Sequence, residues 1–175
     1  MYDLPKGWAW CRVQSFIKLT GGAQPPKSTF EYEPTGDNIR LIQIRDYKTD
    51  AFVTYIPKTS ARRFCSKTDV MIGRYGPPLF QILRGLEGSY NVALMKAETD
   101  SRLMSNDYLY YLLQDSELLR TLESVSDRTC GQDGINMFVL NNYLLPIPPL
   151  MEQNRIIARV EEILSILNKI EASLS

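Results

Sequence analysis

Histidine is absent from this 175-residue chain. Its absence removes the commonest general base and makes Ser-His or Cys-His chemistry impossible within the chain. Cysteine is scarce as well: Cys11, Cys65 and Cys130 are odd in number, far apart and in no spacing typical of metal ligands. We therefore expect reduced, mostly buried thiols, with neither a disulfide framework nor a zinc site.

Long apolar runs are also missing. No stretch approaches the length of a membrane span, and Met1-Tyr2-Asp3 has neither the basic nor the apolar region of a signal peptide. Because 44% of the residues are apolar, disorder is not expected either. The sequence predicts a folded protein of the cytoplasm with no membrane partner.

Net charge is zero, with 20 Lys and Arg against 20 Asp and Glu, but the distribution is uneven. Residues 27–84 hold ten basic and six acidic side chains, a net charge of +4, whereas residues 85–149 hold four and nine, a net charge of −5. An excess of four positive charges supports a phosphate-contacting face only weakly, and ordinary solvated charge explains it equally well.

Motifs for nucleotide and group-transfer chemistry are not found. The long polar loop of residues 20–38 begins with Gly21-Gly22 but has no Gly-Lys-Ser or Gly-x-Gly-x-x-Gly pattern. Pro148-Pro149 follows Ile147, so it is not the Asn-Pro-Pro-aromatic motif that serves an adenine amino group, and neither an S-adenosylmethionine glycine motif nor a plausible nuclease cluster is visible. These absences disfavour an enzyme, and no cofactor is expected on this chain.

The end of the chain carries the strongest pattern that is present. Pro149 suits the first position of a helix because its missing N–H would be unpaired there, and Glu152 suits the helix dipole in the first turn. The apolar residues that follow step by four and three, the spacing of a coiled-coil seam, over roughly three heptads or about 36 Å. We expect this seam to pair with another chain or segment, through Ile156, Val160, Ile163, Leu167 and Ile170, with Ile157 and Leu164 widening it at e positions. The alternative, an amphipathic helix folded back on its own domain, remains open.

The rest of the chain predicts an α+β fold with a mixed or antiparallel sheet, in residues 1–148, before a coiled-coil helix in residues 149–175. Alternation and apolar runs indicate strands at residues 39–45, 52–56, 70–72, 91–96, 137–140 and 143–147. A leucine stripe at residues 106–123 indicates one helix, which Ser105 or Asn106 can cap.

Several landmarks, in this order, resemble one half of a specificity subunit of Type I restriction-modification systems. The resemblance covers nearly the whole chain, and the last block is the most specific. The landmarks are Leu4-Pro5-x-Gly7-Trp8 with Trp10, Gly21-Gly22 followed by proline, the strand around Gln43-Ile44, Asp69-Val70-x-Ile72-x-Arg74-x-Gly76, the Gly131 loop, and Pro146-Ile147-Pro148-Pro149-Leu150-x-Glu152-Gln153-x-Arg155-Ile156.

The resemblance implies a non-catalytic DNA-recognition role. In that family each target-recognition domain reads one half of a split double-stranded DNA sequence, and the helices that follow the two domains pair antiparallel as spacers. Methylation and restriction subunits bring the catalysis, with S-adenosylmethionine on the methylation subunit. A half-length chain would homodimerise or pair with a second half. A helix-mediated interaction module without DNA affinity is the alternative, and a stand-alone methyltransferase or nuclease is disfavoured by the missing motifs.

Residues that touch DNA must be proposed from chemistry, because recognition domains of this family diverge where they read bases. Arg can contact guanine through two hydrogen bonds, Gln or Asn can contact adenine, and Lys, Thr or Tyr can fix phosphates. Arg62-Arg63 is a further candidate that a charged turn explains equally well. The residues we expect at DNA are Lys27, Gln43, Arg45, Lys48, Arg74, Tyr75, Arg128 and Gln132.

Overall fold

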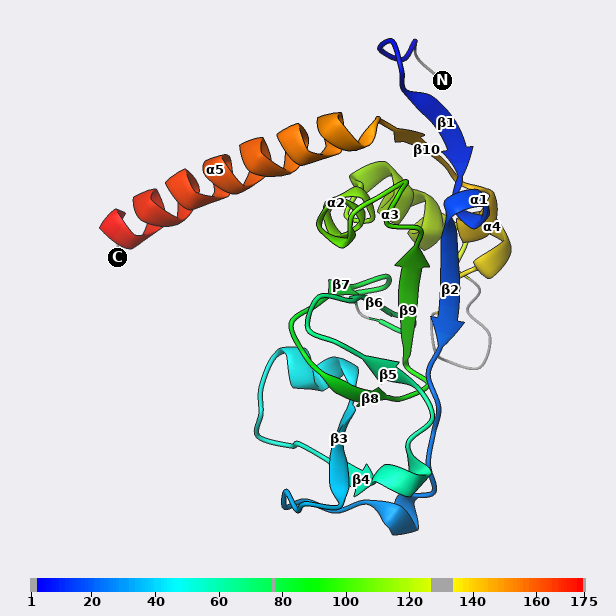
Figure 1. Ribbon diagram of the computed structural model, residues 1–175, viewed down its shortest axis with the longest axis vertical. Helices are drawn as coiled ribbons and strands as arrows, with labels where there is room; N and C mark the ends of the chain where they lie inside the picture. The colour runs from blue at the N-terminus through cyan, green and yellow to red at the C-terminus, as the bar shows by residue number, and fades with distance from the viewer. Residues whose placement is uncertain (1–2, 77, 127–133, 175) are drawn as a thin grey trace.

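The protein is elongated, with a long helix leaving one end and a small sheet at the other (Figure 1). The structure, a computed structural model, describes residues 3–76, 78–126 and 134–174. Three sheets follow one another along the molecule, of two, four and four strands. The α+β class with mixed and antiparallel sheets, expected from the sequence, is confirmed.

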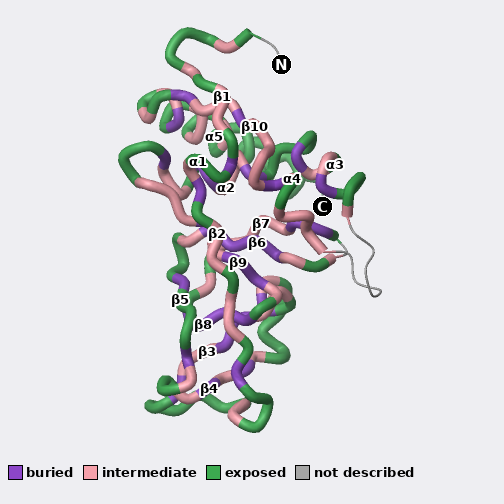
Figure 2. The backbone as a smooth tube through the Cα atoms, turned by 90° about the vertical axis from the view of Figure 1, so that its right-hand side faces the viewer, coloured by how far each residue is buried: buried purple, intermediate pink, exposed green. Residues whose placement is uncertain are grey.

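The middle sheet has the order β2-β9-β6-β7 and is antiparallel throughout. Its strands are β2 (Ile17–Gly21), β9 (Leu94–Thr99), β6 (Val70–Gly73) and β7 (Ile82–Leu83). All four residues of β6 are buried, as expected for a continuous apolar run in the centre of a sheet. Figure 2 shows this buried centre between more exposed flanking segments.

The distal sheet has the order β4-β3-β8-β5 and is mixed, since β3 and β8 run parallel. It comprises β4 (Tyr55–Pro57), β3 (Asn38–Ile42), β8 (Gly88–Tyr90) and β5 (Phe64–Cys65). Three single-turn 3₁₀ helices border it, η1 (Lys27–Thr29), η2 (Ile44–Tyr47) and η3 (Lys58–Ser60). A small core of its own, around Leu41, Ile56 and Ala61, lies beneath this sheet.

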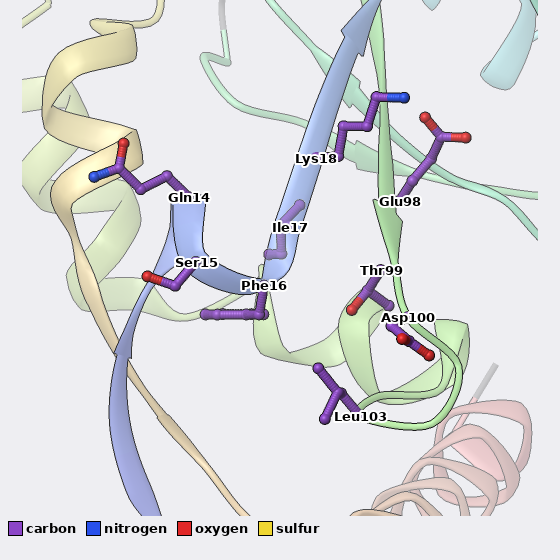
Figure 3. Close-up of a pocket in the computed structure, with 9 residues that line it drawn as sticks. All are labelled: Gln14, Ser15, Phe16, Ile17, Lys18, Glu98, Thr99, Asp100 and Leu103. Carbon is purple, nitrogen blue, oxygen red and sulfur yellow. The ribbon is translucent and has the colours of Figure 1, made fainter.

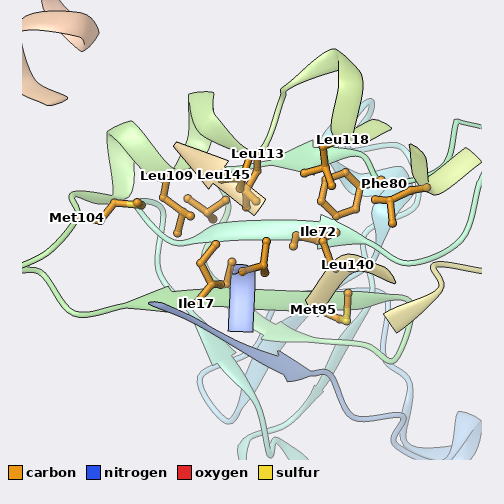
Figure 4. Packing of buried hydrophobic residues seen from close by; sticks show 14 of the residues in the cluster. Ile17, Ile72, Phe80, Met95, Met104, Leu109, Leu113, Leu118, Leu140 and Leu145 are labelled. Atoms are coloured by element: carbon orange, nitrogen blue, oxygen red, sulfur yellow. The ribbon is translucent and has the colours of Figure 1, made fainter. Parts of the chain in front are cut away.

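Near the other end, β1 (Ala9–Arg12) pairs antiparallel with β10 (Leu144–Ile147), which joins the two ends of the globular part. Four helices surround this ribbon and one end of the middle sheet: α1 (Val13–Phe16), α2 (Asn106–Leu112), α3 (Ser116–Ser124) and α4 (Met137–Asn142). Leucines of α2, α3 and α4, together with Val13 of α1, form the main core with the middle sheet (Figure 4). Each such leucine contributes about 1.5–3 kcal/mol on full burial.

The last helix, α5 (Leu150–Leu174), begins directly after Pro149, one residue later than the sequence predicts. The carbonyl oxygen of Pro149 accepts hydrogen bonds from the N–H groups of Glu152 and Gln153 at 2.9 and 3.0 Å, so the proline closes the first turn. The helix packs against α2, whose Tyr111 lines an open groove with α5 residues between Glu161 and Ala172, and its end projects from the globular part (Figure 1). No helix in the described part of the chain is long and apolar enough to cross a membrane.

Several sequence-based predictions were wrong in detail. The strands expected at residues 52–56 and 91–96 begin three residues later, at Tyr55 and Leu94. The strand expected at residues 39–45 ends at Ile42, because the chain turns into η2. The single helix expected at 106–123 is two, since the Asp115 side chain caps a new helix by accepting from the N–H of Leu118 at 2.8 Å. The segment 137–140 is helical because Asn136 caps it, accepting from the N–H of Val139 at 3.1 Å. The expected cap by Ser105 is confirmed.

Candidate nucleic-acid interface

The turn after β3 presents a predicted arginine to solvent. Gln43 and Asp46 form a capping box around η2: the Gln43 side chain accepts from the N–H of Asp46, and Asp46 accepts from the N–H of Gln43 at 3.1 Å. Gln43 also donates its amide to the hydroxyl of Thr54 at 3.2 Å. Arg45 and Lys48 are exposed on this turn. The side-chain amide of Gln43 makes its hydrogen bonds within the chain.

Asp46 is the buried charge behind this turn, at 4% exposure. Burial raises the pKa of its carboxyl above the ordinary value, although the N–H of Gln43 and the guanidinium groups of Arg40 and Arg45 pull the pKa down. Arg40 approaches it at 3.8 Å and Arg45 at 3.9 Å. The Asp46 carboxylate therefore attracts the Nε end of the Arg45 guanidinium, while the Arg45 side chain remains half exposed.

Arg45 lies over an exposed aromatic ring that the sequence reading did not single out. Its guanidinium carbon is 5.6 Å from the ring centroid of Phe52. Phe52 is 60% exposed, and Tyr32, which is 71% exposed, lines the same hollow of about 390 Å³. Asp50 lines the same hollow, and its carboxylate pairs with Arg40 at 2.8 Å. An arginine beside exposed aromatics is chemistry suited to phosphates and base faces. Phe52 was expected to begin a strand, and only the fold shows that it precedes β4 with its ring in solvent.

A second arginine and aromatic pair follows β6. The guanidinium of Arg74 lies 5.5 Å from the ring centroid of Tyr75 and donates to the carbonyl oxygen of Val92 at 3.3 Å. The backbone N–H of Arg74 donates to the carbonyl of Ala93 at 2.9 Å, which fixes the loop against the start of β9. Tyr75 forms an antiparallel bridge with Gly134. Contact of Arg74 and Tyr75 with DNA stays a prediction.

The two pairs lie close together in the fold although 29 positions separate Arg45 from Arg74. Ile44, the neighbour of Arg45, packs against Gly73, the neighbour of Arg74: a Cβ on Gly73 would lie 3.3 Å from Ile44 Cδ1. We group the two pairs and Lys48 as one proposed surface and name it the arginine rim. Its members are Arg45, Lys48, Phe52, Arg74 and Tyr75.

The other predicted DNA contacts are not brought to the arginine rim. Lys27 is exposed in η1, at the opposite end of β3 from η2 (Figure 1). Arg62 donates to the carbonyls of Thr59 and Ala61 at 2.8 and 3.3 Å, as a charged turn would. Arg128 and Gln132 lie outside the described residues. Contacts of all these residues with DNA stay predictions.

A different groove, of about 540 Å³, lies at the junction of α1, β2 and β9 (Figure 3). Lys18, Glu98 and Asp100 put both signs of charge around it, with Phe16 and Leu103 as the apolar part. Burial of Glu98 opposes ionisation, but hydrogen bonds from Thr20 and Lys96 outweigh it and lower the pKa of the carboxyl. This mixed lining does not favour a polyanion.

The residues of α5 expected to meet a partner divide into two groups. Ile156 and Ile157 are partly buried against the main core of their own chain. Every described residue from 161 to 174 is exposed, including Ile163, Leu164, Leu167 and Ile170. Val160 lies at the boundary between the groups with intermediate burial. Their pairing with a partner stays a prediction, and the exposed group is the surface available for it.

The cysteines fit the expected role of structural thiols in the described part of the chain. Cys65 is buried, and burial raises the pKa of its thiol to about 11. Cys11 is half-buried and Cys130 lies outside the described residues. Within residues 3–76, 78–126 and 134–174, no group of three or more His, Cys, Asp or Glu side chains is placed to hold a metal ion.

Comparison with known proteins finds relatives that are named as specificity subunits. No protein-family model matches the chain. It is 25% identical over 170 residues to the Type I restriction enzyme MjaVIII specificity subunit of Methanocaldococcus jannaschii, covering 95% of this chain and 39% of that protein. It is 24% identical over 182 residues to the EcoAI specificity subunit of Escherichia coli, covering 97% of this chain and 30% of that protein.

Solved structures show the same fold. The HsdS subunit of Thermoanaerobacter tengcongensis superposes with a TM-score of 0.76 at 22% identity, covering 99% of this chain and 41% of that one. The S subunit of a Type I system from M. genitalium gives a TM-score of 0.63 at 12% identity, covering 98% of this chain and 43% of that one. The chain spans less than half the length of the relatives it matches. The resemblance predicted from the sequence is therefore confirmed: this chain is similar, over nearly all of its length, to one half of a Type I restriction-modification specificity subunit.

Proposed function

We propose that this chain reads one half of a bipartite double-stranded DNA sequence and directs the methylation and restriction subunits of a Type I complex to it. The observation that carries this proposal is the similarity, over 95% and 97% of the chain, to two proteins named as specificity subunits. The matching fold supports it as well, with TM-scores of 0.76 and 0.63 to solved specificity subunits at 22% and 12% identity.

The globular part, residues 1–148, is the recognition domain in this proposal, and the arginine rim is its DNA face. Arg45 and Arg74 each hold a guanidinium near an aromatic ring, at 5.6 and 5.5 Å from its centroid, which limits the conformations that binding must select. Arg is the side chain best suited to two hydrogen bonds with guanine, and the exposed Lys48 suits a phosphate.

The helix α5, residues 149–175 in the sequence-based division, is the spacer and pairing element. A lone helix of this length is marginal in water unless it is packed, and its last fourteen described residues are all exposed. A second specificity half, either another copy or a different chain, supplies the missing apolar surface. Two copies would form a two-fold pair and read a symmetric split site.

Catalysis belongs to the partners in this proposal. The methylation subunit carries S-adenosylmethionine and transfers the methyl group, the restriction subunit cleaves, and this chain selects the site in the cytoplasm. Its contribution is the surface that places the methylation subunit on one DNA sequence rather than another.

The experiment that tests the proposal is a methylome map of cells expressing this chain with its cognate methylation subunit. The expected result is a split methylated motif that disappears when the chain is omitted. An Arg45→Ala/Arg74→Ala double variant should lose the motif. Arg120→Ala, which removes an exposed arginine from α3, should keep it. Absence of any chain-dependent motif, with both proteins folded and associated, would refute the proposal.

The second candidate function is a protein-interaction module without DNA affinity, in which α5 alone is functional. The exposed apolar residues of α5 and the zero net charge of the chain favour it. Salt-dependent DNA binding separates the two functions, because phosphate contacts release counterions and weaken steeply as salt rises. The module predicts no such binding even with the methylation subunit present.

A further inference from the structure

Gln153 is a fully buried polar side chain in the first turn of α5, with 0% exposure. Its Nε2 donates to the carbonyl oxygen of Leu103 at 2.7 Å and to that of Pro148 at 3.0 Å. Its Oε1 accepts from the backbone N–H of Ser105 at 3.3 Å. The carboxamide thus ties the helix to a segment about fifty positions earlier in the chain.

These partners determine the orientation of the amide. Two carbonyl oxygens require N–H donors, and one N–H requires an oxygen, so only a carboxamide facing this way satisfies all three groups. Glutamate would turn an oxygen toward two carbonyls, and an apolar side chain would leave them without a partner. These three backbone groups therefore require glutamine at position 153. Helix formation alone would require only a residue of good helix propensity there.

Ser105 connects the hydrogen bonds of Gln153 to a second helix, α2. Its N–H is held by Gln153, and its Oγ accepts from the N–H of Tyr108 at 3.2 Å as the cap of α2. Gly7 packs against Pro149, the residue just before α5, since a Cβ on Gly7 would lie 3.3 Å from Pro149 Cγ. The base of α5 is therefore fixed to the segment before α2 and to the first turn of the chain.

Beyond this joint the helix meets its own chain at the main core and along α2, whose Tyr111 lines an open groove with Leu164 and Asn168. Ile156 and Ile157 pack on the main core, and every described residue from 161 onward is exposed. A helix of 25 residues is about 37 Å long at about 1.5 Å per residue, so a tilt of about 10° at its base moves its end by about 6 Å. That displacement is nearly two base-pair steps of about 3.4 Å.

We propose that Gln153 is a positioning residue that fixes the direction of α5 from the recognition domain, and through it the number of base pairs allowed between two half-sites. This inference rests on the proposed DNA-recognition function for its consequence, but its mechanical part concerns the isolated chain. The identity of the bases in each half-site is set elsewhere, at the recognition domain, and does not depend on Gln153.

The test on DNA uses the complex of this chain with its cognate methylation subunit. Half-sites separated by a series of spacer lengths are methylated in one pool and read by sequencing. Wild type should accept one spacing, whereas Gln153→Met, which keeps most of the volume but no amide, should accept spacings one base pair shorter and longer at ten percent or more of the wild-type yield. Asn154→Met, the exposed neighbour on the same helix, is the control and should behave as wild type.

The outcomes separate this inference from the function on which it rests. No spacing-dependent methylation by wild type would refute the proposed function. Methylation by wild type together with an unchanged single spacing in Gln153→Met would overturn the inference. Changed base preference within a half-site would also overturn it, because Gln153 would then act on recognition and not on direction.

A measurement without DNA covers the case in which Gln153→Met does not fold. Gln153→Asn keeps a carboxamide but is one methylene too short to reach both carbonyls. Spin labels at exposed positions 117 and 168, in a background without native cysteines and diluted with unlabelled protein, report the direction of α5 by the distance between them. Wild type should give one narrow distribution and Gln153→Asn one at least twice as wide. Equal widths would overturn the inference.

Discussion

Gln43 and Asp46 cap one another across a single turn, with the backbone N–H of Gln43 donating to Asp46 Oδ2 at 3.1 Å. The turn directs Arg45 into solvent and places a buried carboxylate beneath it. The cost of this arrangement is visible in the fold, because Asp46 Oδ1 is buried without a hydrogen-bond partner among the described residues.

The raised pKa of Asp46 makes stability depend on pH. Burial keeps the folded-state pKa above the ordinary value of 3.8, so between these two pKa values the folded protein binds more protons than the unfolded chain. The free energy of unfolding therefore falls as pH rises through that window, and the loss is complete above the folded-state pKa. Asp46→Asn removes this group, so its stability relative to wild type should increase from pH 4 to pH 7. Urea unfolding at several pH values measures the difference; a constant or decreasing difference would contradict the prediction.

Gly21 and Gly22 are adjacent in the sequence, but the space around their Cα atoms differs. A Cβ on Gly22 would overlap the backbone carbonyl of Asn91, while nothing lies within 4 Å of one on Gly21. Gly22→Ala should lower the free energy of unfolding by about 2–4 kcal/mol because the backbone must shift, and Gly21→Ala should change it by about 0.5 kcal/mol or less. Thermal or urea unfolding compares the free energies of unfolding of the two variants directly. Equal values would show that the close approach of Gly22 to Asn91 does not contribute to stability.

Local signals account for the parts of the fold that the sequence predicted. Pro149 and the heptads after it specify α5, and the cap by Ser105 specifies the start of α2, because both depend on neighbours within a few residues. The turn at Gln43 and Asp46 was missed because these residue types are not a strong capping pattern, and the strand propensity of Ile42 and Ile44 dominated. The α4 helix was missed because its apolar run, Met137 to Leu140, is short enough to fit either state.

The candidate site was predictable as chemistry but not as geometry. Arginine and glutamine near strand ends suggest base and phosphate contacts, and the backbone segments that carry Arg45 and Arg74 pack together; a shared DNA-binding surface stays a prediction. What joins them is the packing of Ile44 on Gly73, a contact between distant segments that no local pattern contains. Gln153 was recognised only as part of a motif, since its burial depends on carbonyls fifty positions away.

The arginine rim should contribute to the salt dependence of DNA binding. Arg45→Ala and Arg74→Ala should each weaken binding by the complex with the methylation subunit, and each lost phosphate contact should reduce the slope of log affinity against log salt by about 1. A loss of about 1–3 kcal/mol confined to one base position would instead identify the arginine as a base reader. Fluorescence anisotropy over a salt series measures both quantities. Arg120→Ala is the control, and equal effects of all three variants would exclude a special role for the rim.

The boundary at Val160 predicts where the chain can be shortened. Removing residues after Val160 leaves Gln153, Ile156 and Ile157 in place, so the unfolding midpoint of the globular part should be kept. Removing residues from Gln153 onward exposes the main core and leaves the carbonyls of Leu103 and Pro148 unpaired, so the midpoint should fall. Circular dichroism melts of the two truncations test this, and equal melts would show that the base of α5 does not support the domain.

Pairing should depend on the exposed part of α5 and not on its base. Ile163 and Leu167 are 44% and 49% exposed and lie four positions apart on one face of the helix. Aspartates at both positions would bring charges into the apolar seam, so Ile163→Asp/Leu167→Asp should give a single-chain mass by analytical ultracentrifugation with the melt of the globular part unchanged. Ala158→Asp/Ser165→Asp places the same two charges on the far face of the heptad and should leave pairing intact. If the seam variant stayed paired, or if both variants dissociated equally, the apolar seam would not be the pairing surface, and the second half would have to bind through the globular part.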